Sequence, residues 1–409
     1  MADFHQSGAI TTLHRLNADG HLRLERELEN ISDRVAIGLV LPALYSEFQT
    51  PAMRGIVNEL SKVRYLKHII VALGRANFSQ YQHAKTFLED LAGSVTILWI
   101  DSDPIQQLFR TLRRNGVSPG PDGKGRSCWL AYGYLLATGS CDVIAVHDCD
   151  IKNYNRDLLA RLCYPVASPD LNFDFCKGYY ARITGCLHGR VTRLFLTPLV
   201  RALHSLAPGD GFLRFLDSFR YPLAGEFAMK ADLARINRIP GDWGLEVGVL
   251  SEIHRNCNVS RICQVDLADS YDHKHQALSA TDFSTGLGRM ATEIARCLLH
   301  TLAAGGHVLT PDDFDTLEAR YVQTAVEMVD RYYADAKLNG LEFNRHAEEL
   351  AVSVFSASLR NGARKYLADP FAEDVLPSWN RVVNAVPDVC DRLMEAGERT
   401  SRPASLCVA

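Results

Sequence analysis

The chain has 409 residues, and its 48 acidic and 44 basic residues give a net charge of −4 at neutral pH with the histidines uncharged. This balance excludes the strongly basic surface that is typical of nucleic-acid-binding proteins. Hydrophobic residues make up 47% of the chain and charged residues 22%. These fractions are typical of a globular protein and exclude a disordered or coiled-coil chain.

The sequence carries no pattern that directs a chain to or across a membrane. No apolar run approaches the roughly 18 residues of a membrane-spanning helix, and the first 20 residues lack the basic and then apolar pattern of a signal peptide. The eleven cysteines include no C-x-x-C pair, so we expect buried thiols instead of a disulfide framework or a cysteine zinc site. We therefore expect a cytoplasmic protein without a membrane or nucleic-acid partner.

Short apolar runs alternate with helix-period segments in the first 150 residues. The runs predict strands at 35–44, 68–73, 95–101 and 142–147, and the segments between them predict helices at 52–63, 79–92, 105–114 and 126–138. This alternation predicts an α/β fold with a doubly wound, mostly parallel sheet. Ligands of such sheets bind beyond the carboxyl ends of the strands.

After residue 151 the pattern becomes mixed and then helical. It predicts strands at 173–183 and 260–267, a helix at 191–206, and an almost entirely helical region from about 284 to 366 that includes 315–338 and 342–364. The first 20 residues and the tail at 395–409 have the weak patterning of mobile ends.

Two carboxylates follow the strand predicted at 142–147. Asp148 and Asp150 are two residues apart, so both side chains can face one cation. Mg²⁺ is typically held by one or two carboxylates together with phosphate oxygens of a substrate. A rival pair, Asp101 and Asp103, precedes a proline and a helical pattern, so we interpret Asp103 as a helix N-cap. The acidic residues at 312–315 are likewise interpreted as a helix start.

Two glycine-containing loops could bind anions. Lys124 ends a loop rich in proline and glycine, and Arg190 directly precedes the helix predicted at 191–206. Backbone amides, a helix dipole and a full positive charge would converge on a phosphate or carboxylate at either place. Plain surface turns at the start of a helix explain both loops equally well.

Two further loops carry carboxylates among glycines and aromatic residues. Glu226 and Glu246 have this setting, which suits the hydroxyl groups of a sugar, although each could instead be an ordinary residue near a helix N-terminus. The histidines at 273 and 275 lie in a polar loop, where an imidazole is either a metal ligand or simply solvated.

The order of these segments resembles that of the retaining GT-A glycosyltransferases that make glucosyl-3-phosphoglycerate, over about residues 35–300. The segments that carry the resemblance are LPAL at 41–44, GKG at 123–125, DCD at 148–150, KGYY at 177–180, GRVT at 189–192, PLAGE at 222–226, GLEVG at 244–248 and DH at 272–273. The resemblance implies a GT-A fold. It also implies metal-dependent transfer of glucose, with retention, from a nucleoside diphosphate glucose to the 2-hydroxyl of 3-phosphoglycerate.

The resemblance also implies roles for single residues. The nucleotide sugar would be bound by Pro42, Ala43, Leu44, Ser46, Lys124, Asp148 and Cys149, with the first three lining the base. Mg²⁺ or Mn²⁺ would be bound by Asp150 and His273. The acceptor would be held by Gly189, Arg190, Thr192 and His275. The expected catalytic residues are Asp148, Arg190 and Glu246.

The resemblance divides the chain into an N-terminal arm (1–30), a Rossmann-like half that binds the nucleotide sugar (31–151), an acceptor-binding half (152–283) and a helical C-terminal extension (284–409). The extension would serve either dimer contacts or coverage of the site, and we expect a homodimer.

Several positions depart from the family pattern. The segment YSE stands at 45–47 where the family usually has Asn-Glu-Glu, and GRAN at 74–77 replaces its usual acidic turn after the second strand. Both departures leave the donor base open among uridine, adenosine and guanosine. Tyr271 and His275 replace its usual arginine and asparagine beside the metal-binding histidine, so acceptor recognition could differ as well.

Other activities stay open at this point. The alternatives within transferases are an inverting enzyme, mannose transfer from GDP-mannose and transfer to free glycerate. A nucleotidyltransferase and an inactive scaffold of the same fold are alternatives of other classes.

Overall fold

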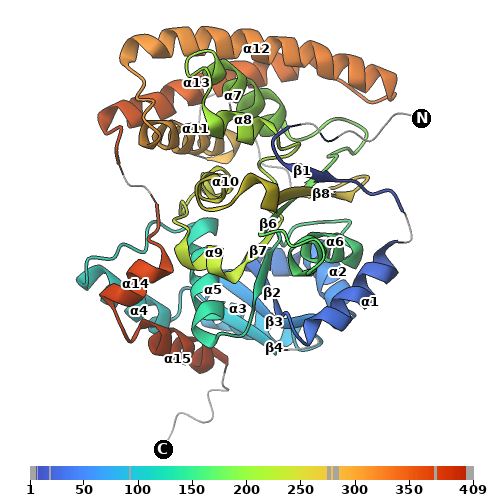
Figure 1. Ribbon diagram of the computed structural model, residues 1–409, viewed down its shortest axis with the longest axis vertical. Helices are drawn as coiled ribbons and strands as arrows, with labels where there is room; N and C mark the ends of the chain where they lie inside the picture. Colours follow the sequence, from blue (N-terminus) through green and yellow to red (C-terminus); the bar gives the residue numbers. More distant parts are fainter. Residues whose placement is uncertain are drawn as a thin grey trace, which may run out of the picture.

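A computed structural model describes residues 6, 8–17, 20–91, 94–273, 278–279, 285–372 and 375–401. An eight-stranded sheet in the order β1-β8-β6-β7-β5-β2-β3-β4 forms its centre (Figure 1). The strands are β1 (Thr11–Leu13), β2 (Ile37–Leu44), β3 (Leu66–Gly74), β4 (Ser94–Trp99), β5 (Val143–Val146), β6 (Phe175–Tyr180), β7 (Phe227–Lys230) and β8 (Ile262–Ala268). Strand β7 is antiparallel to β5 and β6, and the other pairings of these strands are parallel. The predicted α/β fold with a mostly parallel sheet is confirmed.

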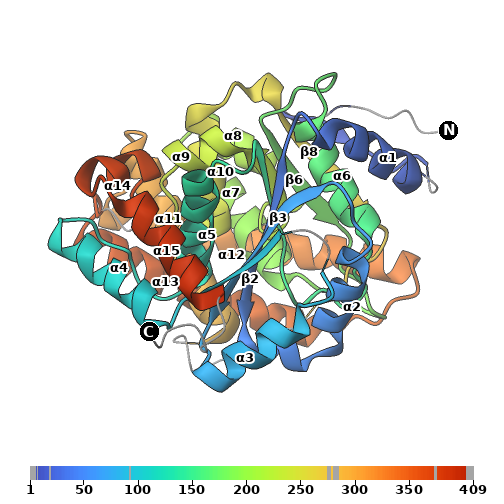
Figure 2. The same ribbon diagram turned by 90° about the horizontal axis from the view of Figure 1, so that it is seen from below.

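Helices cover both faces of the sheet. On one face, Leu39 and Leu41 share a core with α1 (Gly20–Ser32), α2 (Pro51–Leu60), α3 (Phe78–Phe87) and α6 (Arg156–Ala167). On the other face, Val40 and Val146 share a core with α4 (Asp103–Arg114) and α5 (Lys124–Thr138). Figure 2 shows α5 on one side of β2 and β3, and α2 and α3 on the other. Because successive side chains of a strand point to opposite faces, a strand covered on both faces reads as one apolar run.

The helix starts follow local capping chemistry. Helix α12 (Pro311–Leu338) begins after the N-cap Thr310, whose backbone N–H and hydroxyl both donate to Asp313, so the predicted acidic helix start is confirmed. The N-cap residue of helix α4 is Ser102 and Asp103 lies in the first turn, so the N-cap predicted at Asp103 is wrong by one residue. The helix dipole stabilises the negative charge of the Asp103 carboxylate at this position.

The C-terminal region lies at two ends of the molecule. Helices α11 (Gly286–Ala304), α12 and α13 (Arg345–Ala368) lie with α7 (Thr197–His204) and α8 (Gly211–Asp217) at one end, whereas α14 (Trp379–Ala385) and α15 (Val389–Ser401) lie at the other, beside α4 and α5 (Figure 1). Trp379 stacks on Trp129 of α5 with ring centroids 4.6 Å apart, and its indole N–H donates to the Trp129 carbonyl. The last helices therefore return to the first half of the chain.

Some elements differ from the sequence prediction. Where a mobile N-terminus is expected, residues 11–13 form the edge strand β1, which pairs with β8. The four residues of β7 were not predicted either, nor were the helices α1, α6, α8, α9 (Ala231–Ile236), α10 (Leu245–Asn256), α14 and α15, the last of which extends into the tail expected to be mobile. Strands this short show no periodicity that could identify them. Within the described part of the chain, no helix combines the length and apolarity that crossing a membrane requires.

Candidate active site

The carboxyl end of β5 is the centre of the candidate site. Strand β2 pairs with β5 as far as Val40 and Val146, and it then continues to Leu44. The predicted base-binding residues therefore extend beyond the end of β5, beside the segment that carries Asp148 and Asp150. Leu44 is 39% exposed, and Ser46 lies on the exposed surface of the following turn, η1 (Tyr45–Gln49). Leu44 thus offers exposed apolar surface that can contact a nucleotide base, whereas Ala43 is 5% exposed and packs in the core.

Lys124 links two of the predicted site carboxylates. Its Nζ lies 2.6 Å from Asp148 Oδ1 and 3.0 Å from Glu246 Oε1. Burial lowers the pKa of Lys124, but the two carboxylates outweigh this effect and raise the pKa well above its usual range. Burial likewise opposes the charge of Asp148, yet Lys124 holds the pKa of that carboxyl below its usual value. Lys124 and Asp148 are therefore charged at neutral pH. The structure brings together Lys124, Asp148 and Glu246, which come from separate segments of the sequence.

Asp150 and His273 form the predicted metal pair. Asp150 Oδ2 lies 3.6 Å from His273 Nδ1, and Asp150 Oδ1 is buried without a hydrogen-bond partner among the described residues. A carboxylate oxygen in that state fits a cation ligand. Within the described ranges, no group of three or more histidine, cysteine or acidic side chains could hold a metal ion. The pair therefore suits a cation that takes its remaining ligands from a substrate phosphate or water.

Backbone contacts hold the metal pair together. Ile151 forms an isolated antiparallel bridge with His273, and Lys152 N donates to the Asp272 carbonyl at 2.8 Å. Asp272 N in turn donates to Asn153 Oδ1 at 3.0 Å. The segment after β5 and the segment after β8 are thus joined, although more than a hundred residues separate them in the sequence.

A buried polar cluster lies directly behind these groups. The Glu226 side chain is fully buried and accepts hydrogen bonds from Tyr180 Oη at 2.7 Å and Tyr271 Oη at 2.5 Å. Burial, together with the charge of Asp148, raises the pKa of Glu226. Lys177 donates to the Ala224 carbonyl at 2.6 Å, and burial lowers its pKa to about 8. Lys177 and Glu226 belong to the segments that carry the family resemblance, but nothing in the sequence indicates that Tyr180 and Tyr271 stack with centroids 3.7 Å apart.

The predicted acceptor residues lie at the start of a π-helical turn, η2 (Val191–Leu196), that leads into α7. Gly189 has φ +73°, a left-handed conformation that glycine adopts without strain. Arg190 is the N-cap of the turn. The Thr192 hydroxyl is buried and has no hydrogen-bond partner in the described part of the chain. Single π-helical turns occur frequently at functional sites. The remaining predicted acceptor residue, His275, lies outside the described residues.

Cys149 differs in setting from the other predicted residues. Its side chain is 2% exposed and packs in the core that the sheet shares with α1, α2, α3 and α6. Burial raises the pKa of its thiol well above the usual value. The thiol therefore points away from the site. A role in binding the nucleotide sugar can involve only the backbone of Cys149.

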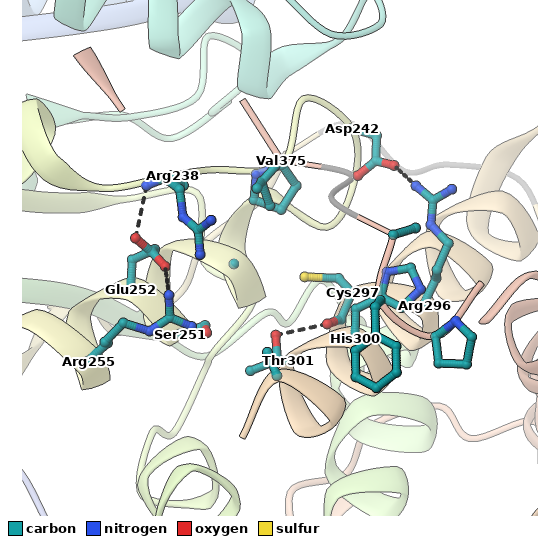
Figure 3. A pocket seen from close by; sticks show the side chains of 16 residues that line it. Arg238, Asp242, Ser251, Glu252, Arg255, Arg296, Cys297, His300, Thr301 and Val375 are labelled. Atoms are coloured by element: carbon teal, nitrogen blue, oxygen red, sulfur yellow. Dashed lines mark hydrogen bonds and ion pairs between the residues drawn. The ribbon is translucent and has the colours of Figure 1, made fainter. Parts of the chain in front are cut away.

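A cavity of about 290 Å³ lies between α10 and α11. Figure 3 shows that Arg238 and Cys297 face this cavity, and that an ion pair of 2.7 Å joins Arg296 to Asp242 at its edge. None of the predicted site residues lines it. It lies on the far side of α10 from the candidate site, because Glu246 in the first turn of that helix contacts Lys124 instead.

Gly225 leaves no room for a side chain. A β-carbon there would lie 2.5 Å from Asp148 Oδ2 and 2.7 Å from Lys124 Nζ, both of which are ends of flexible side chains. We expect Gly225→Ala to displace this ion pair and lower kcat by about tenfold to a hundredfold, with little change in melting temperature. Steady-state kinetics and thermal melts check this prediction. Gly55→Ala on α2 is the control, since a β-carbon there has no atom within 4 Å; early melting of Gly225→Ala with an unchanged kcat would contradict the prediction.

Solved structures with a similar fold include several of one enzyme. Crystal structures of glucosyl-3-phosphoglycerate synthase from Mycobacterium tuberculosis align with TM-scores of 0.53 for its complex with Mg²⁺ and uridine diphosphate, and 0.55 for its complex with Mn²⁺, UDP-glucose and phosphoglyceric acid. They cover 74% and 75% of this chain and 88% and 90% of theirs, at 21% and 22% identity. At that identity the likeness concerns the fold.

Sequence relatives extend over the whole chain. Glucosyl-3-phosphoglycerate synthase of Persephonella marina is 45% identical over 398 residues, which cover 97% of this chain and 98% of that protein. The enzyme of the same name from Methanococcoides burtonii is 38% identical over 399 residues, which cover 96% and 97% of the two chains. No family model matches the chain. The full-length relationship confirms the resemblance drawn from the sequence: the chain belongs to the glucosyl-3-phosphoglycerate synthases.

Proposed function

We propose that the protein transfers glucose from a nucleoside diphosphate glucose to the 2-hydroxyl of 3-phosphoglycerate, with retention at the anomeric carbon. The observation that carries this proposal is the 45% identity to the Persephonella marina enzyme over nearly the whole of both chains. The gathering of Lys124, Asp148 and Glu246 at the end of β5 supports it, because ligands of such sheets bind at that edge.

The proposed cofactor is Mg²⁺ or Mn²⁺, and the residues that would hold it are Asp150 and His273. A divalent cation there would neutralise the negative charge that develops on the departing diphosphate. The oxygen and nitrogen donors of the pair suit both ions. The buried Asp150 Oδ1, which has no hydrogen-bond partner among the described residues, supports their role.

The chain's own residues have separate tasks in this proposal. The Lys124 ammonium adds fixed positive charge next to the leaving group, where it is worth most in the transition state. Asp148 and Glu246 hold that ammonium in place from two sides and offer oxygens to the hydroxyl groups of the donor sugar. No side chain is assigned as a covalent nucleophile or as a general base. In this scheme the leaving phosphate takes the acceptor proton, on the same face of the sugar from which it departs.

Product analysis tests the proposal. The purified protein is incubated with Mg²⁺ and 3-phosphoglycerate, or with glycerate, and with UDP-, ADP- or GDP-glucose or GDP-mannose as the donor. We expect a glucosyl-3-phosphoglycerate whose NMR coupling constants show a retained α-configuration. A mannosyl product would contradict the proposed donor sugar, and a β-linked product would contradict retention. Turnover with glycerate alone would contradict the proposed acceptor.

Arg190 is the expected contact for the acceptor's anionic groups. Its side chain is 35% exposed at the start of η2, where backbone amides and a guanidinium can bind a phosphate together. We expect Arg190→Ala to raise the KM for 3-phosphoglycerate by about tenfold to a hundredfold and the KM for the donor by less than about twofold. Initial-rate kinetics with each substrate varied in turn measure both constants, and equal increases in the two would contradict the assignment.

We also propose a cytoplasmic location. All ten cysteines in the described ranges are free thiols, as expected in a reducing compartment. Fractionation of the host cells, with periplasmic and cytoplasmic marker enzymes as references, tests this location.

A further inference from the structure

The helical extension holds the loop that carries the predicted acceptor residues. Glu342, between α12 and α13, donates its backbone N–H to the Gly185 carbonyl at 2.9 Å. Tyr321 of α12 donates its hydroxyl to the Leu194 carbonyl at 2.9 Å. Phe195 packs against the rings of Tyr321 and Phe355, with centroids 5.8 Å and 5.6 Å away. The loop before η2 and η2 itself thus lie against α12 and α13.

Glu348 makes the central contact between the extension and this loop. It lies in the first turn of α13, and its side chain is only 5% exposed. One oxygen accepts a hydrogen bond from Arg190 Nε at 2.7 Å, and the other lies 2.9 Å from Arg193 Nη1. The buried carboxylate is therefore ion-paired with both arginines, and its directional, charge-assisted hydrogen bond goes to Arg190 Nε.

The two arginines are used in different ways. Arg193 is almost buried, donates to the carbonyls of His188 and Leu187, and lies over the ring of Tyr332 on α12 at 4.6 Å. Its guanidinium is therefore committed to the structure of the loop. Arg190 is the more exposed of the two, and in the described part of the chain its only polar side-chain partner is Glu348, at Nε. Among the described residues, neither Nη group of Arg190 has a hydrogen-bond or ion-pair partner, so both can bind a ligand.

We propose that Glu348 is a positioning residue of the acceptor site: it fixes the Arg190 guanidinium by its Nε edge so that the two Nη groups face the phosphate or carboxylate of the acceptor. The extension, through α13, is then part of the machinery for acceptor recognition. The inference rests on the proposed function, and it concerns a residue that lies 158 positions after Arg190 in the sequence.

A carboxylate beside an anion site also has an opposing effect, since it repels the anion. Two guanidinium groups share the single charge of Glu348, so the group of three keeps a net charge of +1. A long arginine side chain that is held at one edge loses little conformational freedom when the ligand binds. Positioning therefore outweighs repulsion, and loss of the carboxylate weakens acceptor binding.

Kinetics of Glu348→Gln test the inference. We expect the KM for 3-phosphoglycerate to rise about tenfold, whereas the donor KM and kcat stay within about twofold of the unmodified enzyme. Glu348→Asp keeps the charge on an arm one methylene shorter, so we expect a folded protein with an intermediate acceptor KM. Glu318→Gln is the matched control, because Glu318 pairs with Arg360 and Ser356 between α12 and α13 and has no contact with Arg190.

The outcomes separate the inference from the function on which it rests. Absence of transfer to 3-phosphoglycerate by the unmodified enzyme would contradict the proposed function. Transfer with an unchanged or lower acceptor KM in Glu348→Gln would contradict the inference alone, since it would make the carboxylate neutral or repulsive. An equal rise of the acceptor KM in Glu318→Gln would also overturn it, because that result would reflect general loosening of the extension.

Discussion

Asp150→Asn should lower kcat/KM about a thousandfold, because loss of a metal ligand removes about 4 kcal/mol of stabilisation from the charge on the leaving group. The substitution keeps the size and shape of the side chain. One carboxylate oxygen already lacks a hydrogen-bond partner among the described residues, so replacing it with an amide breaks no protein contact there. We therefore expect an almost unchanged melting temperature together with a large loss of activity.

The measurement is the rate of glucosyl transfer as a function of Mg²⁺ concentration, with thermal melts of the same samples. Asp103→Asn is the matched control, because Asp103 belongs to the rival acidic pair and lies exposed in the first turn of α4. It should retain full activity. Normal turnover of Asp150→Asn in Mg²⁺ would show that this motif does not hold the metal.

The central part of the sheet could be predicted from the sequence, for a physical reason. Strands β2, β3, β4 and β5 are buried on both faces, so they read as continuous apolar runs between helix-period segments. Strand β7 has four residues, and it lies in the sheet because β5 and β6 flank it. The position of such an element is decided by its neighbours in space, and these are not adjacent to it in the sequence.

In the candidate site, too, some residues could be predicted from the sequence and some contacts could not. Asp148 and Asp150 could be found because they follow a recognisable strand, and parallel strands bring their carboxyl ends to one edge. The pairing of Arg190 with Glu348 spans 158 positions, and that of Tyr271 with Glu226 spans 45. Neither pairing leaves a local pattern, because the tertiary fold alone brings these side chains together. The return of α14 and α15 to α5, through Trp379 and Trp129, is a contact of the same kind.

Lys124 separates two carboxylates that would otherwise face each other, so its removal should affect activity, stability and pH dependence together. In Lys124→Met, Asp148 and Glu246 lose their shared cation. We expect kcat/KM to fall at least about a hundredfold, because fixed positive charge beside the leaving group is lost. We also expect the free energy of unfolding to fall by about 2–3 kcal/mol, somewhat less than for a fully buried pair because Lys124 and Asp148 are partly exposed.

The loss of Lys124 should also shift the pH dependence of stability and activity in a definite direction. In the unmodified protein, Lys124 holds the pKa of Asp148 below its usual value, so Asp148 stabilises the fold above about pH 3.9 and loses this effect only as the pH falls through the lowered pKa. Without Lys124, burial raises the pKa of Asp148 instead. Acid unfolding and the acid limb of the residual activity should therefore both move to higher pH in Lys124→Met. Acid titrations followed by circular dichroism and by initial rates measure the two shifts.

The control is Lys62→Met, which removes an exposed lysine paired with Glu59 near the end of α2. It should show neither shift. A loss of activity in Lys124→Met without any movement of the acid limb would mean that Asp148 does not depend on this lysine for its charge.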